Sequence, residues 1–156
     1  MSVTNIIITG LGGQGVLTAA GIVADVAFRY GFEVKQSELH GLSQRGGSVS
    51  SDVRFDREVF SPMVPDGEAD FLVVIAPERV EVNRPHLRPG GVLIAPDAID
   101  TTKLTNHKSL NVALLGVLSQ QVDIPEPVWL DAIGAAFPEK LHIANLQAFA
   151  LGRNRV

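Results

Sequence analysis

Uninterrupted apolar runs mark three segments of the chain, Ile6–Ile8, Phe71–Ala76 and Val92–Ala95. A strand buried on both faces has no polar side, so such runs are typical of a parallel sheet with helices on each side. Helical periodicity appears in the segments between them. The pattern therefore predicts a three-layer α/β domain built on a mostly parallel, Rossmann-like sheet.

Residues 14–30 show the clearest helical periodicity. Apolar residues recur at steps of three and four along two adjacent stripes: Val16, Ala20, Val23, Ala27 and Tyr30 in one, and Leu17, Gly21, Ala24 and Phe28 in the other. A helix that is apolar over so wide an arc is expected to lie between the sheet and a further surface, such as that of a partner. Gly31 is predicted to cap its C-terminus.

Further helices are predicted later in the chain. A short one begins at Pro77, and longer ones cover residues 111–121, 128–137 and 143–151, the last ending at Gly152. Trp129 is predicted to pack in the core or at an interface, without binding a ligand.

The other strands carry weaker signals. Residues 32–37 alternate and predict a second strand, which completes a βαβ unit with the first strand and helix. Alternation from Val49 to Phe60 around a turn at 56–58 predicts one antiparallel hairpin inserted into the parallel pattern. Pro89–Gly91 is predicted as a turn, and residues 96–109 show no strand pattern.

Composition fits one domain over residues 1–156, with 46% hydrophobic and 19% charged residues. The net charge of −4 and the lack of a dense Lys/Arg cluster argue against nucleic acid as a partner. The absence of cysteine excludes disulfides and cysteine-ligated iron–sulfur clusters. No membrane span or secretory signal is evident, so a cytoplasmic protein is expected. No metal site is predicted, because metal-ligand spacing is lacking among His40, His86, His107 and His142.

A glycine cluster directly follows the first strand. Gly10, Gly12 and Gly15 match G-x-G-x-x-G between a strand and a helix, and with Gly13 and Gln14 they form the predicted cofactor-binding loop. Gly10 would permit a tight turn, Gly12 the approach of a phosphate, and Gly15 close packing of helix on strand. The N–H groups of Gly12 to Gly15 and of the first helical turn would then point at the anion. The alternative is a glycine-rich turn that makes a close strand–helix crossing and binds nothing.

A second polar, glycine-rich loop, residues 40–47, follows the second strand. Because both strands of a βαβ unit end at the same edge of the sheet, the two loops are expected to share a crevice. The predicted contacts to a substrate or phosphate come from His40, Ser43, Gln44, Arg45 and Gly46. Arg45 could bind a carboxylate or phosphate through two N–H groups, or it could be an ordinary exposed arginine. His40 is interpreted as a hydrogen-bonding loop residue, and no catalytic residue is predicted.

A dinucleotide-binding unit would also need an acidic residue near the end of the second strand. The candidates are Glu33, which opens that strand, and Glu38, which lies toward the next loop. Neither position matches well, and this weakens an NAD-binding interpretation.

Three motifs together point to a family: Gly10–Gly15, the stretch His40–Val49 with its Ser-Gln-Arg-Gly-Gly sequence, and Gly67–Asp70 before an apolar strand. With these motifs the chain resembles the gamma-type subunit or domain of 2-oxoacid:ferredoxin oxidoreductases, the pyruvate/ketoisovalerate enzymes among them. It is most similar to the small, or beta, subunit of indolepyruvate:ferredoxin oxidoreductase. The likeness covers residues 6–94 and continues loosely from Asn111 onward. The strand that the family leads one to expect within 96–109 is not evident.

The resemblance implies an accessory subunit of an enzyme that oxidatively decarboxylates a 2-oxoacid to an acyl-CoA and passes electrons to ferredoxin. Indolepyruvate or a related aryl or branched 2-oxoacid would be the substrate. Thiamine diphosphate and 4Fe–4S clusters would be held by a large partner subunit. The glycine loop would face the thiamine site or bind the phosphates of CoA. The chain is expected to be inactive alone, and to form a homodimer or a complex with the large subunit.

Two other functions remain open. The chain could be a stand-alone Rossmann-type protein that binds NAD, FMN or CoA. It could also be a non-catalytic docking module whose glycine loop stays empty.

Overall fold

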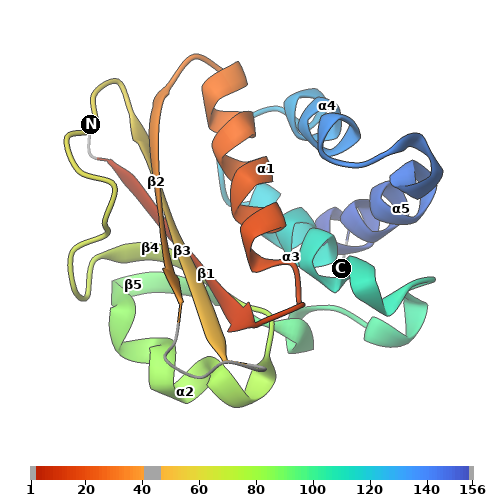
Figure 1. The fold of residues 1–156 in the computed structure, drawn as a ribbon, viewed down its shortest axis with the longest axis horizontal. Helices are drawn as coiled ribbons and strands as arrows, with labels where there is room; N and C mark the ends of the chain where they lie inside the picture. The colour runs from red at the N-terminus through yellow and green to blue at the C-terminus, as the bar shows by residue number, and fades with distance from the viewer. Residues whose placement is uncertain (1–2, 41–46, 155–156) are drawn as a thin grey trace.

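The computed structural model describes residues 3–40 and 47–154. In this part of the chain five strands form one sheet in the order β2-β3-β1-β4-β5 (Figure 1). The strands are β1 (Thr4–Leu11), β2 (Glu33–His40), β3 (Ser48–Asp56), β4 (Ala69–Val74) and β5 (Leu87–Ile94).

Four of these strands run in one direction, and β3 runs against them. The pairs β1–β4 and β4–β5 are parallel, whereas β3 lies antiparallel between β1 and β2. The predicted fold class is thus confirmed, but the predicted hairpin from Val49 to Phe60 is wrong in its second strand. β3 ends at Asp56 with no strand in residues 57–64, and the hairpin is β2–β3. Alternating apolar and polar residues indicate that one face of a strand is buried, but they do not identify the neighbouring strand.

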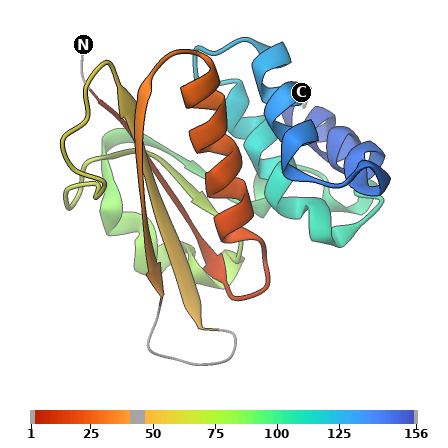
Figure 2. The same cartoon turned by 45° about the horizontal axis from the view of Figure 1, so that its top comes forward.

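The longer helices all lie on one face of the sheet, two of them directly on it and two packed outside those (Figures 1 and 2). α1 packs on β1, β2 and β3, while α3 contacts β4 and β5; α4 packs on α1 and α5 on α3. The helices are α1 (Val16–Arg29), α3 (Leu110–Ser119), α4 (Glu126–Ala136) and α5 (His142–Arg153). The helices expected over 111–121, 128–137 and 143–151 are therefore confirmed, with each end shifted by one or two residues.

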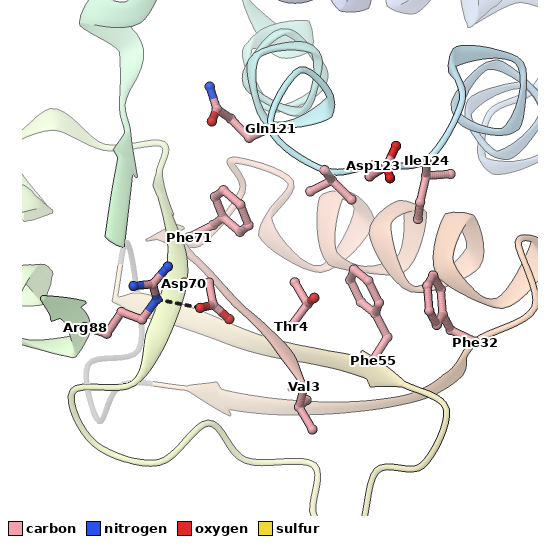
Figure 3. A pocket seen from close by; sticks show the side chains of 11 residues that line it. Val3, Thr4, Phe32, Phe55, Asp70, Phe71, Arg88, Gln121, Asp123 and Ile124 are labelled. Carbon is pink, nitrogen blue, oxygen red and sulfur yellow. Dashed lines mark hydrogen bonds and ion pairs between the residues drawn. The ribbon is translucent and has the colours of Figure 1, made fainter. Parts of the chain in front are cut away.

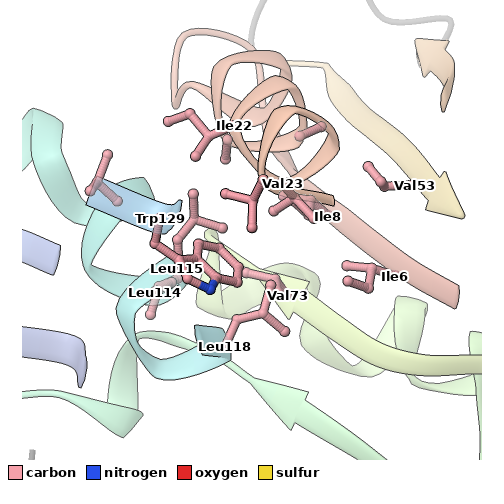
Figure 4. Close-up of a cluster of buried hydrophobic side chains, with 14 of the residues drawn as sticks. Ile6, Ile8, Ile22, Val23, Val53, Val73, Leu114, Leu115, Leu118 and Trp129 are labelled. Atoms are coloured by element: carbon pink, nitrogen blue, oxygen red, sulfur yellow. The ribbon is translucent and has the colours of Figure 1, made fainter. Parts of the chain in front are cut away.

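The main core fills the space between these helices and the sheet (Figure 4). Ile6 and Ile8 of β1 point into it, and Trp129 from α4 lies among the leucines of α3. Trp129 is 1% exposed and stacks on Phe149, with 6.0 Å between ring centroids. Its predicted role in core packing is confirmed.

The other face of the sheet has a much thinner cover. It consists of the one-turn helix α2 (Val80–Asn83), the 3₁₀ turns on either side of it, and the segment after β3. A small second core forms there around Ile7, Leu72 and Val74. Over β2 and β3 this face carries polar residues such as Ser37 and Ser50, and part of it stays open as a groove.

The buried face of helix α1 differs in part from the one that was predicted. Val16, Ala20, Val23 and Ala27 are buried as predicted, whereas Tyr30 is exposed. In the second predicted stripe Leu17, Gly21 and Phe28 are exposed, Phe28 by 71%, whereas Ala24 is partly buried against the core. The residues that complete the buried face are instead Ala19, Ile22 and Val26. Gly31 adopts a φ of 103° just after the helix, which confirms the predicted C-terminal cap.

Two predicted glycine positions were wrong. Gly152 does not end α5, which continues to Arg153; it is buried where α5 crosses α3. Pro89–Gly91 lies inside β5 beside an irregularity in the β4–β5 register, so it is not a turn between elements. At both positions the lack of a side chain lets two backbone segments approach closely. The local sequence looks the same at such a position as at the end of a helix or strand.

Candidate functional site

The glycine loop between β1 and α1 is held by its own hydrogen bonds. The side-chain oxygen of Gln14 accepts a hydrogen bond from the N–H of Leu11 at 2.7 Å, and the N–H of Gln14 donates to the Leu11 carbonyl at 3.2 Å. The Gln14 oxygen thus serves the loop itself. The N–H of Gly12 donates to the carbonyl of Gly47 at 3.0 Å. That N–H is therefore occupied, contrary to its expected contact with an anion.

The glycines divide their roles differently from the prediction. Gly10 is still within β1, where a side chain would meet the Gln14 oxygen at 2.7 Å and Ile75 at 3.3 Å. Gly13 and Gly15 adopt φ of 88° and 81°, the left-handed region that favours glycine. Gly12 has no positive φ, and a methyl group added there would make only an ordinary contact with the Gly47 carbonyl at 3.8 Å. Gly10 therefore permits the close strand–helix approach, and Gly13 and Gly15 make the turn.

Asn111 clamps the loop from the other half of the chain. It is buried at the start of α3, and its side-chain N–H donates to the carbonyl of Gly15 at 3.1 Å. Its side-chain oxygen accepts a hydrogen bond from the N–H of Val112 at 2.9 Å. A methyl group added at Gly15 would collide with this amide, whose Cγ would lie 3.2 Å away. Asn111 thus fixes the residue that begins α1.

The loop keeps the features that an anion site needs. Among the described residues, none accepts a hydrogen bond from the N–H of Gly13 or Gly15. No acidic residue lies in the first turn of α1, so the positive end of the helix dipole is not neutralised locally. N–H groups free at a helix N-terminus are suited to a phosphate or carboxylate.

The second predicted loop is described only at its ends. Gly47, the last residue of that loop, accepts the hydrogen bond from Gly12, so this end of the loop lies beside the glycine loop. His40 ends β2, and nothing is described of its side chain. Ser43, Gln44, Arg45 and Gly46 lie outside the described residues.

The acidic residues considered for a ribose contact do not form a dinucleotide site. Glu33 opens β2 at the edge of the sheet opposite the glycine loop, and its carboxylate accepts a hydrogen bond from the N–H of Val59 at 3.1 Å. Glu38 lies within β2, before its last residues. Glu38 is thus near the carboxyl end of β2, but β3 separates that strand from β1, and Glu38 lines a groove on the sheet face away from α1.

A cleft of about 300 Å³ lies at the far end of β1, beside Thr4 (Figure 3). Phe32, Phe55 and Phe71 line it together with the ion pair between Arg88 and Asp70, whose Nε and Oδ1 atoms lie 2.6 Å apart. The other Asp70 oxygen accepts a hydrogen bond from the N–H of Asn5 at 2.7 Å. These polar groups satisfy one another, so the glycine loop is the better candidate site.

Asp52 lies in the groove on the thinly covered face of the sheet. Its Oδ2 atom accepts a hydrogen bond from the N–H of Val64 at 2.8 Å. Burial raises the pKa of Asp52, an effect only partly offset by that hydrogen bond and by the charges of His86 and Arg54. The folded protein therefore binds a proton at Asp52 more readily than the unfolded chain does.

Asp52→Asn is expected to change how stability depends on pH. With a raised pKa in the folded state, the wild-type contribution is fully present below the unfolded pKa of about 4 and is lost as pH rises through the folded value. The variant should therefore gain stability relative to wild type as pH rises above about 4, and the gain should then level off. Urea unfolding of both proteins from acid to neutral pH measures this difference. Curves that stay parallel throughout would contradict it.

Comparison with known proteins adds to this geometry. The family model described as pyruvate ferredoxin/flavodoxin oxidoreductase matches residues 5–155. The chain belongs to this family. The resemblance that the motifs indicated is therefore confirmed.

Relatives within the family are similar over most of the chain. An indolepyruvate oxidoreductase subunit IorB from Thermococcus kodakarensis is 35% identical over 190 aligned positions, which cover 95% of this chain and 93% of the relative. The pyruvate/ketoisovalerate oxidoreductases common subunit gamma of the same organism is 35% identical over 88 positions, covering 54% of this chain and 47% of that one.

Solved structures of the family share the fold. A keto/oxoacid ferredoxin oxidoreductase gamma subunit from Geobacter sulfurreducens matches with a TM-score of 0.83 and 24% identity, covering 99% of this chain and 97% of that chain. A 2-oxoglutarate:ferredoxin oxidoreductase from Magnetococcus marinus, with 2-oxoglutarate, coenzyme A and succinyl-CoA bound, also gives 0.83 at 20% identity. This chain covers 32% of that longer chain.

Three further observations concern metal sites, membrane spans and the segment 96–109. Among the described residues, no group of three or more His, Asp or Glu side chains could hold a metal ion. In the same residues no helix is long and apolar enough to cross a membrane. Between 96 and 109 the structure has 3₁₀ turns and no strand, as the sequence predicted.

Sequence reasoning missed two contributors to these sites. Asn111 was noted only as a residue that continues the resemblance, and its contact with Gly15 spans 96 positions. Gly47 was expected near the first loop, but not as the acceptor for Gly12. No local pattern indicates either contact, because both depend on how distant elements are packed.

Proposed function

We propose that this chain is the small, accessory subunit of a 2-oxoacid:ferredoxin oxidoreductase, with indolepyruvate or a related aryl or branched 2-oxoacid as substrate. The observation that carries the proposal is the 35% identity to an IorB subunit across nearly the full length of both chains. The complex would oxidatively decarboxylate the 2-oxoacid, form an acyl-CoA and reduce ferredoxin. We place it in the cytoplasm.

The absence of cysteine supports a division of labour between subunits. With no cysteine in its 156 residues, the chain has no thiolates for 4Fe–4S clusters, which would lie in a large partner subunit. Thiamine diphosphate would be held there too, because this sequence lacks a Gly-Asp-Gly…Asn signature. The outward stripe of α1, including Phe28, provides apolar surface for that subunit or for a second copy of this chain.

The glycine loop would hold a phosphate of CoA. The N–H groups of Gly13 and Gly15 and the N-terminus of α1 are the groups available, while Gly12 and Gln14 shape the loop. CoA supplies the thiol that accepts the acyl group. The contribution of this chain is to position CoA by its phosphates, and the loop 40–47 would complete that contact.

The proposal is tested by activity with and without the partner. The purified chain is expected to reduce no artificial electron acceptor with indolepyruvate, pyruvate or other 2-oxoacids, because it lacks ligands for the clusters. Co-expression with a cysteine-rich large subunit from the same genome should yield a complex that does so in the presence of CoA. Turnover by the chain alone would end the accessory-subunit proposal.

The two alternative functions predict different experimental results. A stand-alone nucleotide-binding protein would bind NAD, FMN or CoA in calorimetric titration and recover no large subunit. A docking module would recover the large subunit, but a Gly13→Val variant, which fills the loop, would leave the KM for CoA unchanged. The proposal expects that KM to rise.

A further inference from the structure

A groove of about 390 Å³ opens on the thinly covered face of the sheet. Its floor is formed by β1, β2 and β3, and its walls by the segment after β3 and by the turn–helix–turn around α2. Charged groups of both signs line it, with apolar residues Leu39, Met63 and Val64 beside them. It lies on the opposite face from α1 and does not include the residues of the glycine loop.

Arg79 carries the only buried side-chain nitrogen or oxygen among the described groove residues that lacks a hydrogen-bond partner. Its Nε atom is buried and has no hydrogen-bond acceptor among the described residues. The backbone beneath it is fixed, since its N–H donates to Ala76 at 2.9 Å and its carbonyl accepts from the Asn83 side chain at 2.8 Å. A buried donor without a partner is rare, and a water, an ion or a ligand can supply the acceptor. The other guanidinium nitrogens of Arg79 also have no hydrogen bond or ion pair to the described residues, so an anion in the groove would meet an unpaired cation.

Asp52 presents the complementary group. Its Oδ2 atom is used by the N–H of Val64, and its Oδ1 atom accepts no hydrogen bond from the described residues. Among those residues Asp52 forms no ion pair with Arg79 or His86, although all three line the groove. One groove therefore holds a cationic donor and an anionic acceptor that do not satisfy each other.

We propose that this groove binds a small zwitterion of the α-amino acid class, with its carboxylate on Arg79 and its ammonium on Asp52. A ligand with a single charge would pair with the oppositely charged group and would be repelled by the other. A ligand that is only anionic is further disfavoured by the carboxylate of Asp66, which also lines the groove. The side chain of the ligand would pack on Leu39, Met63 and Val64, which favours an aliphatic amino acid. The site is independent of the function proposed above.

The test compares three probes on the full chain by calorimetric titration. L-leucine carries both charges, 4-methylpentanoate lacks the ammonium, and 3-methylbutylamine lacks the carboxylate. L-leucine is expected to bind, and each fragment to bind about tenfold or more weakly, because each loses one charged hydrogen-bonding group. A fragment that binds as tightly as L-leucine, or no binding of L-leucine, would overturn the proposal.

Variants then locate the site. Arg79→Met and Asp52→Asn are each expected to weaken L-leucine binding about tenfold or more. Arg57→Met, which removes an exposed arginine outside the groove, should leave it unchanged. Circular dichroism checks folding, and amide NMR shifts of Leu39, Ser50 and Val64 on titrating wild type with L-leucine locate the site without any variant. Unchanged binding in both groove variants, or shifts confined to other residues, would show that the groove is not the site.

Discussion

Gly152→Ala is expected to lower the free energy of unfolding by at least about 3 kcal/mol. A methyl group at Gly152 would collide with the carbonyl oxygen of Ala113 and lie 3.0 Å from the backbone nitrogen of Val117. Both atoms belong to the backbone of α3, so relief requires α3 and α5 to move apart. That movement would loosen core contacts of Phe149 and the leucines of α3. Urea unfolding monitored by circular dichroism measures the effect.

Gly134→Ala is the matched control for this prediction. Gly134 is also inside a helix, but nothing lies within 4 Å of a methyl group added there. Alanine is favoured over glycine in a helix by about 0.5–1 kcal/mol, so this variant should be slightly more stable than wild type. Gly116→Ala, which would approach Phe149 and lie 2.7 Å from the Arg153 nitrogen, should behave like Gly152→Ala. Equal changes in the free energy of unfolding at Gly134 and Gly152 would show that helix propensity, and not the crossing of α3 and α5, determines the effect.

Gly15→Ala is expected to cost about 3 kcal/mol of stability and to impair CoA-dependent activity of the assembled complex. The φ of 81° costs an L-residue about 1–2 kcal/mol, and the added methyl group collides with the buried amide of Asn111. Relief requires the loop to shift, which would displace the N–H groups of Gly13 and Gly15. The KM for CoA should therefore rise in any complex that still assembles.

A double-mutant cycle separates the two causes of this loss. Asn111→Ala alone should cost about 1 kcal/mol, because it removes one hydrogen bond to the Gly15 carbonyl, which keeps its second donor, the N–H of Ala19 at 3.0 Å. In the double variant the space left by Asn111 accommodates the methyl group. The combined loss should therefore be smaller than the sum of the single losses. Additive losses would mean that the collision contributes nothing and that backbone strain explains the whole effect of Gly15→Ala.

Several predictions from the sequence succeeded because they depend on local periodicity. The apolar run Ile6–Ile8 is a buried central strand, and the spacing of Val16, Ala20 and Val23 marks the buried face of α1. The glycine loop lies between them, as its pattern predicted. Motif spacing also identified the family, which the matching family model confirms.

Other predictions failed where two arrangements share one local pattern. Val53 and Phe55 alternate with polar residues in the same way whether the partner is residues 59–61 or β2. Gly152 would look the same at the end of a helix as at a crossing between helices. In each case the distinguishing contact is made by a residue distant in the chain.

By itself, the sequence determined most of the strands and helices, the main buried stripe of α1, and the family to which the chain belongs. Side-chain pattern encodes these properties within one or two turns of backbone, where the geometry is the same in every fold. Only the tertiary structure decided that β3 separates β1 from β2, that Asn111 donates a hydrogen bond to Gly15, and that Arg79 and Asp52 line one groove. Those pairings depend on how the whole chain closes on its core, since the residues that meet are far apart in sequence and carry no mutual local signal.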